Sequence, residues 1–165
     1  MLKYSLLAIL AFCAFSGFCA GVAQVGQPLP SELAPTDENG AAHPLALYKG
    51  KTGVVIFFFP KAFTGGCVCE NRGFSDYAEK YMKKGYTVIG ASRDIPETLV
   101  KFKSIYKLNY TMLSDPNDEL SRALGLVPGQ RDSIVIDKNG IVIKQEHNVD
   151  APTHHKTLIN EIAKQ

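Results

Sequence analysis

Runs of apolar residues separate polar stretches along this chain and predict a series of buried strands. Six consecutive apolar residues, Val54 to Phe59, are typical of a fully buried strand. Thr87–Ala91 has the same character, and Thr111–Leu113 predicts a further short strand. The sequence therefore predicts at least three strands in the middle of the chain.

Apolar residues recur at helical spacing after each of these strands, which predicts helices. The first helix ends at Gly85, and the second begins at Pro96, a residue that suits a first helical turn. A short third helix follows 115–118, and a last helix follows 150–155. The expected inward faces are Phe74, Tyr77, Ala78 and Tyr81 in the first helix, Leu99, Phe102 and Tyr106 in the second, Leu120, Ala123 and Leu124 in the third, and Leu158, Ile159 and Ile162 in the last.

Two Asn-Gly dipeptides predict tight turns. The turn at 37–40 indicates a small hairpin near the N-terminus, after a proline-rich extended segment. The turn at 138–140 joins two further strands, 133–137 and 141–144. The order of elements predicts an α/β protein: one thioredoxin-like domain over 24–165, with a central mixed sheet flanked by helices and an N-terminal hairpin extension.

The N-terminal segment has the pattern of a secretory signal. Lys3 precedes an apolar stretch, 6–15, which is shorter than a membrane span. Gly21-Val22-Ala23 offers a cleavage site before Gln24. We therefore expect residues 1–23 to be removed and the mature chain to be exported to a bacterial periplasm, without stable membrane association. The alternative is an uncleaved N-terminal anchor.

Composition narrows the choice of function. The 165 residues suffice for one domain with a sizeable core. Eighteen basic and sixteen acidic residues give a formal net charge of +2, and the basic residues are scattered, which argues against nucleic acid as a partner. Of the four cysteines, only Cys67 and Cys69 would remain after cleavage. Two cysteines so close together cannot join distant parts of a fold, which indicates a chemical role.

Cys67 lies at the junction between the first strand and the first helix. A helix N-terminus presents free N–H groups and the positive end of the helix dipole. That environment favours the thiolate, which is the nucleophilic form of cysteine. The sequence therefore predicts a reactive cysteine at this junction.

The residues around Cys67 resemble those of a known family. Pro60, Thr64 and Cys67 match the Pro-x-x-x-Thr-x-x-Cys signature of peroxiredoxins, and the stretch 57–61 is similar as well. The segments 88–94, 113–116 and 131–137 resemble later parts of the same family, in particular its bacterioferritin-comigratory or Q-type branch. The resemblance covers the chain from about Gly26 to its end.

This resemblance implies a thiol-dependent peroxidase that reduces hydrogen peroxide and organic hydroperoxides. Cys67 would attack the peroxide and become a sulfenic acid. Thr64 and Arg131, with the backbone N–H groups of Gly66 and Cys67, would stabilise the thiolate and the departing oxygen. No cofactor is implied, and we expect a monomer or weak dimer.

Two supporting residues follow from the same resemblance. Pro60 would shield the site and fix the loop. Glu70 is similar to a family position whose polar side chain orients the arginine. Taken alone, Thr64 would be a helix cap, Arg131 a surface charge and Glu70 an acid that complements the helix dipole.

The chain departs from the family pattern in two respects. Gly65 and Val68 replace the usual proline and threonine beside the nucleophile. Neither usual position for a resolving cysteine is filled, because one holds Arg72 and the later helical segment, 101–107, has no cysteine. Cys69 is the internal candidate, but a Cys-x-Cys bond requires the helix to unwind. The alternative is recycling by an external thiol, from a thioredoxin-like protein or a glutathione-type thiol.

Two other classes of function remain as alternatives. An exported thioredoxin-like thiol–disulfide oxidoreductase would use the two cysteines for exchange, although it usually has Cys-x-x-Cys. A carrier of Cu(I) would use both thiolates and a histidine. Against a metal site, His43 and His147 lack ligand spacing, and we expect His154 and His155 to be a solvated cap of the last helix.

Overall fold

The computed structural model describes residues 22–30 and 32–162. Most of the predicted signal segment, residues 1–21, lies outside the described residues. The elements in chain order are β1 (Thr36–Asp37), the 3-10 helix η1 (Leu45–Tyr48), β2 (Gly53–Phe58), α1 (Gly65–Lys83), β3 (Tyr86–Ser92), α2 (Pro96–Tyr106), β4 (Thr111–Ser114), α3 (Glu119–Ala123), β5 (Ser133–Ile136), β6 (Val142–Glu146) and α4 (His154–Ile162).

The strands form one mixed sheet in the order β1-β4-β3-β2-β5-β6, with β2 near its centre. β2 is parallel to β3 and antiparallel to β5. Phe57 pairs with Gly90 on one side and with Ser133 on the other. The end of β2 therefore lies beside the start of β5, which brings the segment before Ser133 next to the loop that leads into α1.

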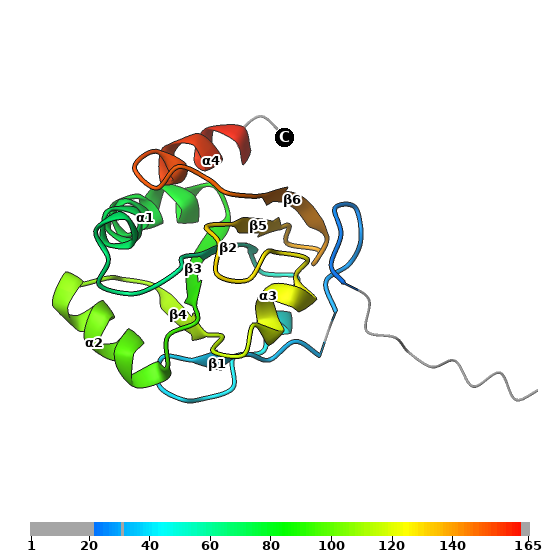
Figure 1. Ribbon diagram of the computed structural model, residues 1–165. Helices are drawn as coiled ribbons and strands as arrows, with labels where there is room; N and C mark the ends of the chain where they lie inside the picture. Colours follow the sequence, from blue (N-terminus) through cyan, green and yellow to red (C-terminus); the bar gives the residue numbers. More distant parts are fainter. Residues whose placement is uncertain (1–21, 31, 163–165) are drawn as a thin grey trace, which may run out of the picture.

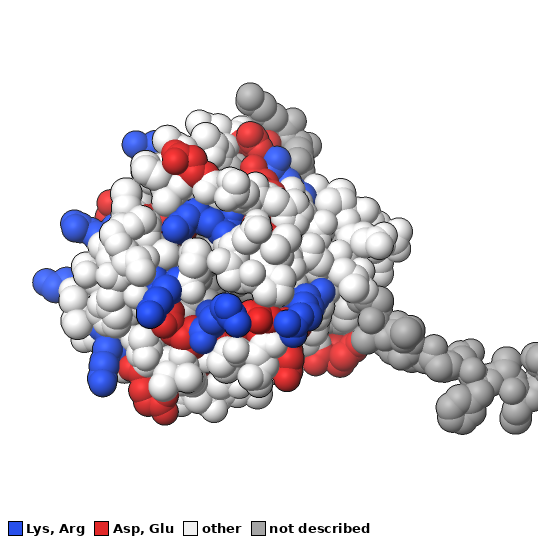
Figure 2. Space-filling view, in the orientation of Figure 1, with Lys and Arg blue, Asp and Glu red and all other residues white. Residues whose placement is uncertain are grey.

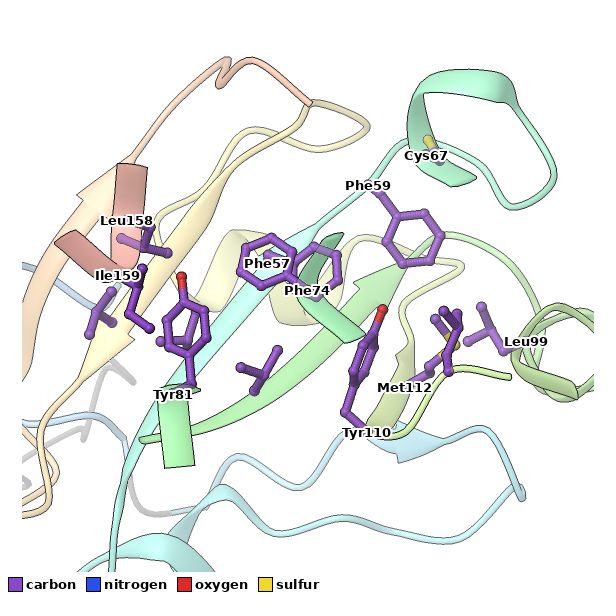
Figure 3. Packing of buried hydrophobic residues seen from close by; sticks show 14 of the residues in the cluster. Phe57, Phe59, Cys67, Phe74, Tyr81, Leu99, Tyr110, Met112, Leu158 and Ile159 are labelled. Atoms are coloured by element: carbon purple, nitrogen blue, oxygen red, sulfur yellow. The ribbon is translucent and has the colours of Figure 1, made fainter. Parts of the chain in front are cut away.

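Helices cover both faces of the sheet, as Figure 1 shows. One core cluster joins the sheet to α1, α2 and α4, and a second joins the opposite face to η1 and α3. At the centre of the first cluster, the rings of Phe57 and Phe74 stack with centroids 4.0 Å apart. Figure 3 shows Cys67 beside Phe59 at one end of this cluster, so the side chain of Cys67 is continuous with the apolar core.

The predicted elements are confirmed, and the predicted strands lie within two residues of the observed ones. The turn at 37–40 forms the expected small hairpin, because Thr36 bridges to Ala42 and the Asp37 carboxylate accepts N–H bonds from Asn39 and Ala41. Helix α1 already begins at Gly65, ahead of the first periodic apolar residue, Phe74.

The prediction of a solvated histidine pair at the start of α4 is wrong. His154 and His155 are 1% and 6% exposed. Both lie where α4 packs against α1, and the ring of His155 makes an edge contact with Tyr77 at 4.7 Å between centroids. The close approach needs a glycine: a Cβ added at Gly73 would lie 2.3 Å from His155 Nδ1.

The surface carries charges of both signs. Lys and Arg side chains are interspersed with Asp and Glu on the face drawn in Figure 2. Among the described residues, no helix combines the length and the apolar character needed to cross a membrane.

We expect Gly73→Ala to destabilise the protein even though alanine favours helices. The new methyl group would overlap the His155 ring, and overpacking of this kind costs about 1–3 kcal/mol, against a gain of roughly 1 kcal/mol in helix propensity. Urea denaturation should therefore show a lower free energy of unfolding. The double variant Gly73→Ala/His155→Ala relieves the overlap and should recover stability, whereas equal losses in both variants would contradict this packing.

Candidate active site

The loop from Pro60 to Thr64 connects β2 to α1 and fixes where the helix begins. The Ala62 N–H donates to the Asp94 carboxylate at 2.7 Å, which ties the loop to the end of β3. Phe63 has a left-handed backbone (φ 65°), and its ring packs edge-on against Phe102 at 5.1 Å. These contacts outweigh the strain of a positive φ at a bulky residue.

Cys67 is the third residue of α1, and its side chain is 1% exposed. The N–H groups of a first helical turn have no acceptor within the helix, and the dipole places partial positive charge there. Arg131 Nη2 lies 3.5 Å from the Cys67 sulfur. The sulfur is therefore held between a helix N-terminus and a guanidinium group, the two surroundings that in general favour a thiolate.

Arg131 reaches this position from the segment before β5. Its Nη1 pairs with the Glu70 carboxylate, which is fully buried on the next turn of α1. A Cβ added at Gly66 would lie 3.4 Å from Arg131 Nη2, an ordinary contact distance, so the guanidinium packs directly against the start of α1. Burial lowers the pKa of Arg131, but Glu70 and Cys67 outweigh this effect, and the pKa is raised overall.

Hydrogen bonds on the core side of α1 also hold its first turn in place. Asn71 donates through its side-chain amide to the Cys67 carbonyl at 2.8 Å. The Tyr110 hydroxyl lies 2.8 Å from Asn71 Oδ1 and donates to it. Both residues are buried, and neither was predicted from the sequence as part of the site. Nothing in the sequence indicated that Asn71 and Tyr110 belong to the site, because they lie far apart in sequence and meet only in the folded chain.

His154 is the main site residue that was not predicted from the sequence. Its Nδ1 lies 2.7 Å from Glu70 Oε1, on the side away from Arg131. Its Nε2 lies 3.2 Å from Ser133 Oγ and 3.5 Å from Glu146 Oε2. The sequence did contain a sign that His154 is buried. His154 is four residues before Leu158, which places it on the apolar face of α4.

The remaining residues that the sequence assigned to the site are Thr64, Pro60 and Cys69. Thr64 is the N-cap residue by position, but its hydroxyl donates to the Lys61 carbonyl at 3.0 Å and makes no capping bond. Pro60 is half-buried in the loop after β2. Cys69 is exposed, while Cys67 is buried. Residues two apart in a helix do not share a face, so the two thiols point in different directions.

This arrangement can stabilise negative charge at one point. A fixed guanidinium and helix N–H groups surround a nearly water-free sulfur, where such interactions are stronger than in bulk water. The structure brings Cys67, Glu70, Gly66 and Arg131 together in a single cluster. It leaves Cys69 outside that cluster.

Comparison with known proteins identifies the family of this chain. The profile of the AhpC/TSA family matches residues 25–145. A chloroplastic peroxiredoxin Q of Suaeda salsa is 36% identical over 142 residues, which is 81% of this chain but 65% of that protein. A protein of Mycobacterium tuberculosis named as a peroxiredoxin is 31% identical over 149 residues, covering 81% of this chain and 94% of the relative.

Solved structures show the same fold. PrxQ of Xylella fastidiosa has a TM-score of 0.80 at 19% identity, and covers 87% of this chain and 98% of its own. The bacterioferritin comigratory protein of Xanthomonas campestris has a TM-score of 0.78 at 21% identity, with 86% and 98% covered. The thioredoxin-like fold predicted from the sequence is thereby confirmed. On the family profile and these relatives together, the chain belongs to the AhpC/TSA family, where its relatives are peroxiredoxins of the Q type.

Proposed function

We propose that this protein is a thiol-dependent peroxidase that reduces hydrogen peroxide and organic hydroperoxides. The observation that carries the proposal is the 3.5 Å contact between Arg131 Nη2 and the buried Cys67 sulfur at the start of α1. Relatives named peroxiredoxin Q support it, as does the alkyl peroxide reduction activity ascribed to the Xanthomonas protein. This chain matches slightly less than two thirds of the length of the first chloroplastic relatives.

The reaction uses the residues as follows. The Cys67 thiolate attacks one peroxide oxygen, the O–O bond breaks, and the departing alkoxide or hydroxide takes up a proton. Cys67 becomes a sulfenic acid. Arg131 and the N–H groups of Gly66 and Cys67 face the charge that develops on the leaving oxygen. The Thr64 hydroxyl, while it donates to a carbonyl, keeps lone pairs that can accept from the peroxide.

Pro60 shields the site, and Glu70 holds the guanidinium of Arg131 in place. Glu70 accepts from Arg131 on one side and from His154 on the other, which fixes both carboxylate oxygens. A guanidinium so held needs little reorganisation when the peroxide arrives.

An external thiol recycles the sulfenic acid in this proposal. One thiol condenses with the sulfenic acid, releasing water and leaving a mixed disulfide, and a second thiol reduces that disulfide. The exposed Cys69 faces away from Cys67 and reaches it only if the first turn of α1 unwinds. A thioredoxin-like protein or a glutathione-type thiol fits this role.

The same geometry weakens the two alternatives. A Cu(I) carrier needs two thiolates that converge on one ion, and a thiol–disulfide oxidoreductase needs a pair that closes readily. Cys67 is buried against Arg131, whereas Cys69 is exposed on another side of α1. The peroxidase assignment uses the buried cysteine alone and is consistent with this separation.

Export to a bacterial periplasm, and a monomeric or weakly dimeric state, complete the proposal. The support for export is the pattern of Lys3 followed by the apolar stretch 6–15.

Cys67→Ser should abolish peroxide consumption, because serine offers no comparable nucleophile at this position. The measurement is the loss of hydrogen peroxide or of an alkyl hydroperoxide in the presence of excess dithiol. Circular dichroism should show an unchanged fold in the variant. Peroxide turnover by the serine variant at the rate of the wild type would exclude Cys67 as the nucleophile.

The recycling route can be determined by the intact mass after one equivalent of peroxide. We expect a gain of about sixteen mass units, the signature of a sulfenic acid awaiting an outside thiol. The same gain should appear in Cys69→Ser. A loss of about two mass units in the wild type, absent from Cys69→Ser, would instead establish Cys69 as the resolving residue. A disulfide-linked dimer would indicate an intermolecular route.

A further inference from the structure

A chain of alternating charges runs from Cys67 through the protein to the outer strand β6. Arg131 contacts the Cys67 sulfur, Glu70 pairs with Arg131, and His154 contacts the far oxygen of Glu70 at 2.7 Å. Beyond His154, Glu146 lies 3.5 Å from the second imidazole nitrogen, and the Lys144 ammonium lies 3.4 Å from Glu146. Peroxide reduction as described above uses Cys67, Arg131 and Glu70, and it involves His154 only as a hydrogen-bond partner of Glu70.

We propose that His154 is a positioning residue of the peroxide site, which as an imidazolium compensates Glu70 and leaves the charge of Arg131 directed at Cys67. The inference rests on the proposed function of Cys67. A carboxylate in contact with a guanidinium cancels much of its field at a neighbouring sulfur. A second cation on the far side of that carboxylate restores the field, and His154 occupies this place.

The hydrogen bonds around His154 fit the charged ring better than the neutral one. When both nitrogens carry protons, Nδ1 donates to Glu70 and Nε2 to Ser133 Oγ. The Ser133 hydroxyl is then free to donate to Glu146 Oε2, 3.2 Å away. When the ring is neutral with Nδ1 protonated, Nε2 needs the Ser133 proton, and Glu146 loses that donor.

The groups that face His154 come from every element packed against it. Glu70 belongs to α1, Ser133 to β5, and Glu146 with Lys144 to β6. The rings of Phe57 in β2 and Phe74 in α1 cover the imidazole, and His155 is its neighbour in α4. Among the residues that the structure describes, the titratable side chains that pair with the imidazole of His154 are the carboxylates of Glu70 and Glu146.

The balance of these effects raises the pKa of His154. Burial lowers this pKa, but the hydrogen bonds and charges of Glu146 and Glu70 outweigh burial. Because the pKa is higher in the folded state than in the unfolded chain, the ion pairs stabilise the protein fully below about pH 6.5. This stabilisation, and with it the second cation behind Glu70, is lost as pH rises through the folded-state pKa.

The test is His154→Asn, whose side-chain amide can still donate to Glu70 but carries no charge. We measure the fraction of Cys67 thiolate by ultraviolet absorbance in a Cys69→Ser background, where Cys67 is the only cysteine of the mature chain. At a fixed pH below the His154 transition, the thiolate-to-thiol ratio should fall by roughly three- to tenfold, the effect of removing one partly shielded charge. His155→Asn is the matched control, since His155 is also buried on α4 but does not contact Glu70, and its ratio should be unchanged.

A second variant, Glu146→Gln, tests the charge on His154 rather than its packing. Glu146→Gln removes a carboxylate beside His154, so the imidazole titration observed by NMR should move to lower pH. If His154→Asn lowers the free energy of unfolding but leaves the Cys67 thiolate ratio unchanged, His154 is structural and the inference is wrong. If the ratio shifts while the wild type consumes no peroxide, the coupling holds and the proposed function fails.

Discussion

The site depends on the ion pair between the partly buried Arg131 and the fully buried Glu70. Arg131 can stabilise a thiolate only where water is largely excluded, and a guanidinium in such a place is costly unless a carboxylate pairs with it. Glu70 meets that need from the helix that also carries Cys67. One ion pair therefore joins the segment before β5 to α1, and the second oxygen of the buried Glu70 carboxylate still requires a hydrogen-bond donor. His154 is buried among aromatic rings because of this requirement.

The sheet topology makes the pair feasible. β2 runs parallel to β3, so the chain leaves β2 at the edge where β3 also ends. β5 runs antiparallel to β2, so its first residue, Ser133, lies at that same edge. Arg131 and Cys67 are 64 positions apart in sequence but meet there. A parallel β5 would have placed the arginine at the opposite end of the sheet.

The sequence predicted much of this arrangement, and its failures have physical causes. Strand β2 was evident because six apolar residues leave no polar face, and Cys67 and Arg131 followed from the family resemblance. The start of α1 was harder to place, since Gly65 and Gly66 are poor helix formers held by the anchored loop before them. His154 was misjudged because two adjacent histidines at a helix start normally face solvent. Its burial depends on Glu70 and on the close approach of α4 at Gly73, neither of which is local in sequence.

In the proposed reaction, the burial of Cys67 also constrains the steps that follow its oxidation. A small peroxide can enter a closely packed site, but a protein thiol cannot reach a sulfur that is 1% exposed. Both routes of recycling, through Cys69 or through an external protein, therefore require the first turn of α1 to open. Asn71 and Tyr110 hold that turn from the core side, while the two glycines at its start weaken it. Asn71 and Tyr110 thus hold Cys67 in place beside Arg131, whereas Gly65 and Gly66 lower the free energy needed to unwind the first turn of α1.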